Sequence, residues 1–431
     1  MLVLSAPLAT GCATATRSLP ALEQEQRTNP GSAEANRSLG IAYYQAGKFT
    51  EAKASLDRAS LLDPKDGATA LYLGLAAEEL NDYAAARRAY SSYLTFGKTS
   101  RVRGQLQSRL AALVRKELLA EAKSAVHDEA TRAGAPALPR TVAVFPLRFS
   151  GRDTTLIPLE RGLADLLITD LSRSAQLTLV ERSRLQALVE ELALQSSGRV
   201  DSTTTVRAGR LLRAGRLVRG SILQLDGTQL RLDAAVVDVA SARVSGSAQG
   251  AQQLEQIFEL EKQVALDLFR ELGVTLTVAE RNAIEQRPTR SLTAFLAYSQ
   301  GLAAEDQGRY EDASRFFQEA VRIDPGFGSA QQKGQEARAA AAGAQLSSAA
   351  VEASLKESGE GAAAGGGKLS GAVQTAASDL NPSAVNAATG GGAAGASAAP
   401  PQKDPASAAT NTEASTGQAK VVIVIQRPKT P

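Results

Sequence analysis

The chain is poor in the residue types that carry most catalytic and cross-linking chemistry. Its 431 residues contain one cysteine, one histidine, one methionine and no tryptophan. A lone cysteine excludes an intrachain disulfide, and one histidine with one cysteine cannot supply the clustered ligands of a zinc site. Aromatic residues make up only 4% of the chain, so the cores must be built from Leu, Ala and Val. We therefore predict no bound metal and no cofactor.

An excess of one charge and long apolar runs are also missing. The 48 basic residues nearly balance the 45 acidic ones, for a net charge of +3, and this weak field does not favour nucleic acid as a partner. After Cys12, no stretch of the sequence approaches the roughly 20 apolar residues of a membrane helix. The length predicts two or three modest domains.

Catalytic constellations are correspondingly few. A Ser/His/Asp triad would have to use His127, which stands beside Asp128 in a polar stretch. A solvated histidine in a loop or at a helix end is the simpler interpretation. The adjacent Glu190 and Glu191 point to different sides of a helix and cannot share a substrate. No Gly-rich phosphate loop with its lysine occurs either, so we predict that the protein is not an enzyme.

The one cysteine stands directly after a short apolar run. Cys12 follows Leu8, Ala9, Thr10 and Gly11, and this arrangement resembles the lipobox of bacterial lipoproteins, in which the thiol is lipidated and becomes the mature N-terminus. The alternative is an incidental thiol, because the preceding residues lack Lys and Arg. The resemblance predicts that residues 1–12 are a signal peptide with a lipobox. Ala13, in place of an aspartate, points by resemblance to the outer membrane.

The N-terminal part of the chain repeats at a shift of 34 residues. At this shift Gly40 falls on Gly74 and Ala52 on Ala86. A period of 34 residues, with small residues where two helices touch, resembles the tetratricopeptide repeat. We predict such repeats over residues 28–130, with residues 103–126 as a capping helix, because stacked hairpins need an end helix to cover their apolar face.

The same spacing recurs later in the chain. It joins Gly40, Ala52, Leu56, Ala59 and Pro64 in the first repeat and Gly301, Ala313, Phe317, Ala320 and Pro325 in the later one. We predict a further hairpin of this type, with an extra helix, over residues 290–357. By resemblance such repeats dock a partner's peptide or helix, here on the concave face around Tyr43 and Tyr44. A purely structural use is the alternative.

Between the repeats, after a linker at residues 133–139 that is rich in Ala and Pro, short strands alternate with helices. The predicted strands are residues 141–147 and 177–181, and then a meander of 217–225, 229–239 and 243–249 with a turn at Asp226 and Gly227. The predicted helices are residues 157–172, 183–194, 203–214 and 254–272. Ser183 and Gln186 have the spacing of a capping box at the start of the second helix.

Taken in order, these segments resemble a known family. The CsgG-like domain has the same succession as VAVFPLRFSG, GLADLLITDLS, LTLVERSRLQALVEEL, AGRLL, LVRGSI and LRLDAAVVDVASARV. The resemblance implies that residues 140–285 form a mixed sheet with packed helices, similar to the N-terminal domain of TolB, and the whole chain is predicted to be α+β. The family includes the curli export lipoprotein, holdfast and flagellar outer-membrane lipoproteins, and more distantly a lipoprotein activator of peptidoglycan synthase.

The curli exporter contributes long hairpins to a shared transmembrane barrel, and such strands need about 9–11 residues each beyond those of the domain itself. This chain has no such surplus, so we predict a non-pore relative that faces the periplasm. A candidate contact surface is a row of arginines at every third position, Arg207, Arg210, Arg213, Arg216 and Arg219. The first three form a loose stripe on a helix. They are interpreted either as a solvated face or as a contact with anionic lipid headgroups or an acidic partner.

The C-terminal part has little to bury. Residues 358–419 are mostly Ala, Gly, Ser, Thr and Pro, and this composition predicts a disordered linker. Residues 420–431 contain a β-branched run that Pro428 ends, namely Val421, Val422, Ile423, Val424 and Ile425. We expect this run to pair with a sheet edge, either in the middle domain or in another protein.

These observations predict an outer-membrane-anchored periplasmic lipoprotein that acts as a protein-binding scaffold in the assembly or export of an envelope or surface structure. Its expected partners are other envelope proteins, bound through the repeat groove and the C-terminal strand, and the membrane, bound through Cys12. A homo-oligomer remains open. The alternatives are an oligomeric curli-type secretion channel component and a regulator of a peptidoglycan synthase.

Overall fold

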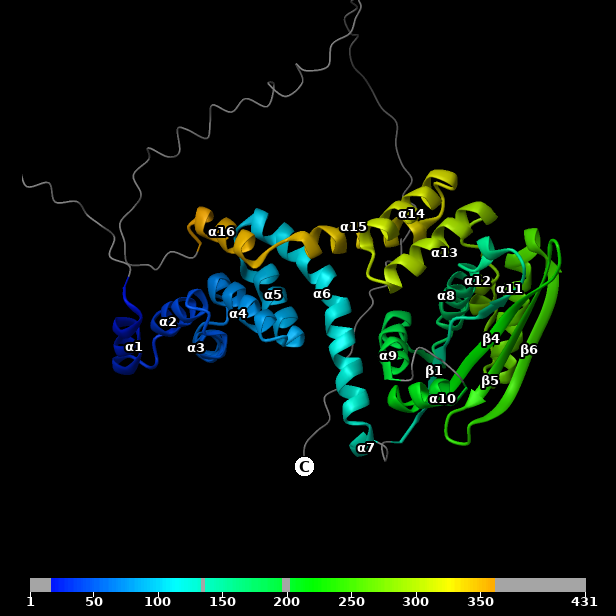
Figure 1. Ribbon diagram of the computed structural model, residues 1–431, viewed down its shortest axis with the longest axis horizontal. Coiled ribbons are helices and arrows are strands. Elements are labelled where there is room, and N and C mark those ends of the chain that lie inside the picture. Colours follow the sequence, from blue (N-terminus) through cyan, green and yellow to red (C-terminus); the bar gives the residue numbers. More distant parts are fainter. Residues whose placement is uncertain (1–16, 133–135, 196–201, 361–431) are drawn as a thin grey trace, which may run out of the picture. The chain divides into compact units, whose positions relative to one another are not determined.

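The computed structural model describes residues 17–132, 136–195 and 202–360. Its first part is helical (Figure 1). The helices are α1 (Leu19–Thr28), α2 (Ala33–Gln45), α3 (Phe49–Leu62), α4 (Gly67–Glu79), α5 (Tyr83–Phe96), α6 (Ser100–His127) and α7 (Glu129–Arg132). The pairs α2/α3 and α4/α5 are the two predicted hairpins. The predicted capping helix is confirmed as α6, which extends beyond residues 103–126 at both ends.

The repeated glycine brings the two helices of each hairpin together. A Cβ added to Gly40 would lie 2.6 Å from Leu56, and one added to Gly74 would lie 2.3 Å from the ring of Tyr90. Leu56 and Tyr90 are fully buried. The glycine in the first helix of each repeat therefore receives a large side chain from the second helix, as the repeat pattern predicts.

The middle part contains the predicted mixed sheet. Its strands are β1 (Leu138–Val144), β2 (Arg148–Ser150), β3 (Thr178–Leu179), β4 (Ala214–Asp226), β5 (Gln229–Asp238) and β6 (Arg243–Gln253). Their order is β3-β1-β4-β5-β6, with β2 also paired to β4. Strands β1 and β2 pair with β4 in parallel, whereas β4, β5 and β6 form the predicted antiparallel meander.

Helices cover both faces of this sheet. They are α8 (Leu159–Leu171), α9 (Arg182–Gln195), α10 (Ser202–Leu211), α11 (Ile257–Glu271) and α12 (Val278–Ile284), with short 3₁₀ turns η1 (Thr154–Leu156) and η2 (Leu254–Gln256). Alternate residues of β1 point to opposite faces. Val142 and Val144 join the core with α8 and α11, whereas Ala143 joins a second core with α9, α10 and the end of α6.

Two predicted boundaries at the start of the domain need correction. Strand β1 lies three residues earlier than residues 141–147, and the separate strand β2 follows it. Pro146, between the two strands, has no N–H to donate to a ladder. Helix α9 begins at Arg182, so Ser183 lies inside its first turn and does not cap it. The predicted capping box of Ser183 and Gln186 is therefore wrong.

The helix predicted at residues 203–214 is also shorter. Helix α10 ends at Leu211, and β4 already begins at Ala214. Between them Arg213 has a φ of 54°, a left-handed conformation that ends the helix. Arg213 therefore does not lie on the helix that carries Arg207 and Arg210.

The third repeat has the same construction as the first two. Helices α13 (Leu292–Asp306) and α14 (Tyr310–Ile323) form a hairpin in which a Cβ added to Gly301 would lie 2.5 Å from Phe317. The predicted extra helix is divided into α15 (Gly328–Gln345) and α16 (Ser348–Ser358). Ser347 begins α16, because its hydroxyl accepts a hydrogen bond from the N–H of Ala350 at 3.1 Å.

Helix α15 packs against both α14 and α6. It thereby joins the third repeat to the cap of the first two. Small residues make this packing possible, and the buried ones recur along one face of α15 as Ala330, Gly334, Ala337, Ala340 and Gly343. No helix within the described ranges has both the length and the apolar character needed to span a bilayer.

Candidate functional site

The inner face of the N-terminal repeats consists of α2, α4 and α6, the first helix of each hairpin and the cap. Helix α16 packs on this face (Figure 1). Its Val351 and Leu355 are fully buried and share one core with Leu71 and Tyr72 of α4. Val351 and Leu355 lie four residues apart, on one side of the helix. The face predicted to dock a helix is thus occupied by a helix of the same chain.

Glu352 of α16 binds two of the inner-face helices. Its Oε1 accepts hydrogen bonds from the hydroxyl of Tyr72 in α4 and from Nε2 of Gln45 in α2, both at 3.0 Å. Burial opposes its ionisation, but the hydrogen bonds from Lys356, Gln45 and Tyr72 outweigh burial and lower the pKa of Glu352. Glu352 is therefore a carboxylate near neutral pH.

Arg109 of α6 holds the junction between α15 and α16. Its Nη1 donates to the carbonyl oxygen of Leu346 at 2.5 Å, and its Nη2 donates to Oγ of Ser348 at 2.7 Å. Its Nε donates to Oε2 of Glu78 in α4 at 2.6 Å. The Arg109 residue is only 6% exposed, and the carboxylate of Glu78 compensates its buried charge.

Glu360, just after α16, occupies a site built from donors. Its carboxylate accepts the backbone N–H of Lys98 at 2.7 Å and that of Thr99 at 3.0 Å. The hydroxyls of Thr99 and Tyr93 also donate to it, at 2.6 and 2.7 Å. Burial raises the pKa of Glu360, but these hydrogen bonds outweigh it and lower the pKa. The site lies at the start of α6, where a helix dipole also favours an anion.

The two predicted tyrosines face different elements. The Tyr44 ring centroid lies 5.6 Å from that of Tyr72, on the side where α16 packs. Burial, with the charges of Glu79 and Glu352, raises the pKa of Tyr44 to about 12. The hydroxyl of Tyr43 instead donates to Glu23 of α1 at 2.9 Å. Partner binding by Tyr43 and Tyr44 stays a prediction.

The three predicted arginines do not all lie on one helix, because Arg213 follows the end of α10. Arg207 donates from Nε and Nη2 to the carboxylate of Glu129 in α7, with the shortest contact at 2.6 Å. Arg213 donates from Nε to the carbonyl oxygen of Pro136 at 3.1 Å. Arg210 is exposed on the last turn of α10. Contact of these arginines with lipid or an acidic partner stays a prediction.

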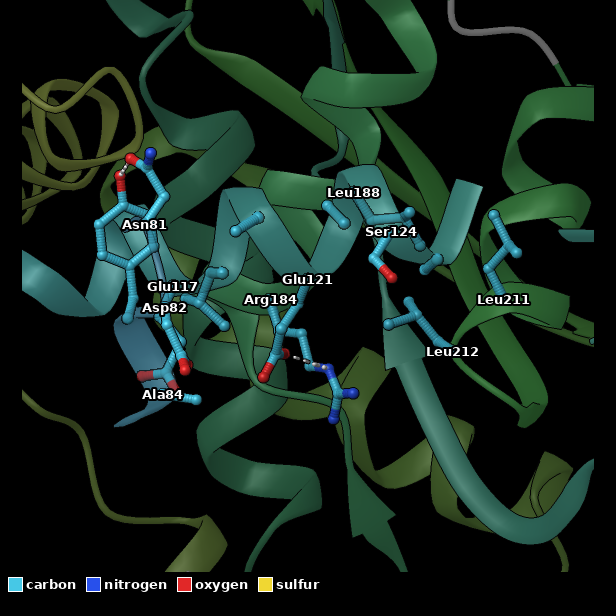
Figure 2. Close-up of a pocket in the computed structure, with 15 residues that line it drawn as sticks. Asn81, Asp82, Ala84, Glu117, Glu121, Ser124, Arg184, Leu188, Leu211 and Leu212 are labelled. Atoms are coloured by element: carbon cyan, nitrogen blue, oxygen red, sulfur yellow. Dashed lines mark hydrogen bonds and ion pairs between the residues drawn. The ribbon is translucent and has the colours of Figure 1, made fainter. Parts of the chain in front are cut away.

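A pocket of about 580 Å³ lies where α6 meets the beginning of α5, α9 and the end of α10 (Figure 2). Its lining combines acidic side chains with leucines, including Asp82, Glu117, Glu121, Leu188, Leu211 and Leu212. Arg87 Nε pairs with Glu117 at 2.8 Å, and Arg184 Nε lies 3.9 Å from Glu121. Because arginines already neutralise two of the carboxylates, we assign no reaction to this pocket.

The remaining candidates concern single residues. His127 is the last residue of α6 and is exposed, as expected for a histidine at a helix end. Among the described residues, no group of three or more His, Cys, Asp or Glu side chains could hold a metal ion. Cys12 and residues 421–425, the proposed lipid attachment site and C-terminal strand, lie outside the described residues.

Known families match three parts of the chain. Residues 123–231 match the family described as curli production assembly/transport component CsgG. Residues 15–59, 38–100 and 294–327 match tetratricopeptide repeat families. No curated protein matches the chain. Among solved structures, the C-terminal domain of LpoB from Salmonella enterica is similar, with 16% identity and a TM-score of 0.22, over 30% of this chain and 94% of its own.

The chain therefore contains a CsgG-like domain and tetratricopeptide repeats, as the sequence predicts. Its α+β fold is also confirmed, with helical repeats on both sides of a mixed sheet in the sequence. Both kinds of domain are non-enzymatic, and together they indicate protein–protein interaction in general.

Proposed function

We propose that the protein is a lipid-anchored scaffold on the periplasmic face of the bacterial outer membrane. It binds other envelope proteins during the assembly or export of an envelope or surface structure. The CsgG match supports the envelope setting, because the description of the matched family refers to curli assembly and transport. Cys12 is the proposed site of lipid attachment, and residues 421–425 are a proposed second contact through strand pairing.

The observation that carries this proposal is the occupied inner face of the repeats. That face buries Val351 and Leu355 of α16 and also binds the carboxylate of Glu352. A surface that combines an apolar groove with placed donors is suited to recognise a helix from a partner. Pore formation is not proposed, because β4, β5 and β6 are already paired with one another in the sheet.

Cell fractionation tests the anchor. The full-length chain and its Cys12→Ser variant are expressed in a bacterial host with an outer membrane. We expect the wild-type chain in the outer-membrane fraction, with an acylated N-terminus by mass spectrometry, and the variant outside that fraction. An unmodified Cys12 thiol, together with cytosolic fractionation of the wild-type chain, would contradict the proposed anchor.

Affinity capture tests the scaffold. The tagged full-length chain is crosslinked in cells, recovered from detergent-solubilised envelopes and analysed by mass spectrometry. We expect a reproducible set of envelope proteins that the tagged Cys12→Ser variant, made in the same amount, does not recover. Ion conductance of the purified protein in planar bilayers would instead support the channel, and stimulation of a peptidoglycan synthase would support the regulator.

A further inference from the structure

In the polar contacts between α16 and the repeats, the repeats mainly supply the hydrogen-bond donors and α16 supplies the acceptors. The repeats supply the donors to both carboxylates: Tyr72 and Gln45 donate to Glu352, and the backbone N–H groups of residues 98 and 99 donate to Glu360. The inner face thus has an apolar centre with a donor site for an anion at two points along it. This pattern is complementary to an acidic amphipathic helix.

Helix α16 is also a separable unit of the fold. It has 11 residues, and a break at residues 346 and 347 divides it from α15. A helix of this length has little stability without its packing surface. It has two large apolar side chains, Val351 and Leu355, and both are buried. Because α16 is the last described helix, its release does not require any of the three hairpins to open.

We propose that α16 is a built-in occupant of the inner face, and that the external partner is an acidic amphipathic helix that displaces it. This inference rests on the proposed scaffold function and specifies its partner. The partner helix carries two apolar residues four positions apart, as Val351 and Leu355 are. It carries one carboxylate directly after the first of them, as Glu352 is, and a second carboxylate follows two residues beyond the end of the helix, as Glu360 does.

Peptide binding to the full-length chain tests this proposal. The probe is a fluorescent synthetic peptide of residues 347–360, and the receptor is the chain with Val351→Asp and Leu355→Asp, which releases its own α16. Fluorescence anisotropy should show saturable binding to this receptor. The wild-type chain should bind at least about tenfold more weakly, because its own α16 competes at high effective concentration.

The carboxylates give a matched control. A peptide with Glu352→Gln and Glu360→Gln keeps the apolar residues, and we expect it to bind the released receptor about tenfold more weakly or worse, because it loses charge-assisted hydrogen bonds. Placing Tyr72→Phe in the receptor should weaken the unmodified peptide but change the affinity of the Gln peptide much less. Equal affinity of the two peptides would overturn the proposal that the partner helix is acidic.

Hydrogen exchange on the unaltered chain provides an independent measurement. If the double variant does not fold, this measurement decides whether α16 leaves the inner face while the repeats stay folded. We expect amides of α16 to exchange well before those of α4, and before unfolding of the repeats. Exchange of α16 only together with α4, or no binding of the peptide to a folded released receptor, would overturn the displaceable occupant. If the peptide binds but envelope capture fails, the proposed scaffold function is wrong and this inference about the groove stands.

Discussion

Gly343 of α15 lies directly against the backbone of Ser108 in α6. A Cβ added to Gly343 would be 1.9 Å from the carbonyl oxygen of Ser108, a distance at which one backbone must move. This contact joins the helix that follows the third repeat to the cap of the first two. The absence of a side chain at one residue therefore determines how closely α15 approaches α6.

Gly343→Ala should consequently destabilise the protein although Ala is the better helix former. We expect a loss of about 1–3 kcal/mol in the free energy of unfolding, because overpacking against a backbone cannot be relieved by a rotamer change. Urea denaturation checks this value. Gly104→Ala on α6 is the matched control, since a Cβ there meets no atom within 4 Å, and it should stabilise by about 0.5–1 kcal/mol. Equal effects of both substitutions would contradict the prediction.

The third repeat allows a similar comparison. Phe317 is fully buried, and its ring would lie 2.5 Å from a Cβ at Gly301. We expect Gly301→Ala to lower the free energy of unfolding by about 1–3 kcal/mol. Gly328→Ala, at the start of α15 in open space, should change it by less than about 0.5 kcal/mol. Calorimetric melting of the two variants side by side provides the measurement, and a stable Gly301→Ala chain would exclude this tight helix contact.

Such local contacts are also what the sequence predicts best. The spacing of Gly301 and Phe317 repeats that of Gly40 and Leu56, so one hairpin indicates the others. The sequence predicts element boundaries less well where local signals compete. Serine is a residue type that favours the N-cap position, but α9 begins at Arg182, one residue before Ser183. A side chain that favours a cap does not fix the position of the first turn when packing favours an earlier start.

The occupied inner face could not be predicted from the sequence. The apolar spacing of Val351 and Leu355 indicates a helix, but it says nothing about the surface that receives it. The hydrogen bond from Tyr72 to Glu352 joins residues 280 positions apart, and no periodic pattern connects them. The arginine stripe shows the same limit of spacing patterns. Arg207 has the spacing of a helical stripe, but the spacing does not reveal that its side chain pairs with Glu129 of α7.

Arg182 connects the CsgG-like domain to the third repeat. This arginine of α9 pairs with Asp306 and Glu305 at the end of α13, and its Nε lies 3.5 Å from Oδ1 of Asp165 in α8. The side chain of Asp306 is only 3% exposed, and that of Arg182 12%. The charges therefore compensate one another away from water.

Removing this cation should be costly. Arg182→Met leaves the buried carboxylate of Asp306 with less compensation, and we expect a loss of about 3–5 kcal/mol in the free energy of unfolding. Arg184→Met is a control two residues away on the same helix, because Arg184 is 60% exposed and pairs with an exposed Glu121. The control should change stability by less than about 0.5 kcal/mol. Comparable denaturation midpoints for the two variants would contradict the role of Arg182.

A second buried ionic cluster lies between α8 and α11. The Nζ atom of Lys262 is 2.5 Å from Oδ2 of Asp170 and 3.2 Å from Oε2 of Glu261. One ammonium thus faces two carboxylates, and Glu261 has no exposed surface. Burial, together with the charge of Asp170, raises the pKa of Glu261 to about 8, although Lys262 acts in the opposite direction. The folded protein therefore favours the protonated form of Glu261 more than the unfolded chain does.

This shift predicts how stability changes with pH. Between the ordinary glutamate pKa of about 4.3 and the folded value of about 8, the folded state binds more protons than the unfolded state. The contribution of Glu261 to the free energy of unfolding therefore falls as the pH rises through this range. The Glu261→Gln side chain cannot ionise, and the variant keeps the pair of Lys262 and Asp170. The substitution should therefore remove most of that fall. Compared with the wild-type chain, the variant should gain stability between pH 5 and pH 8. Urea denaturation of both chains at pH 5, 6.5 and 8 measures the difference. If the two chains keep a constant difference in stability across these pH values, Glu261 does not titrate in this range.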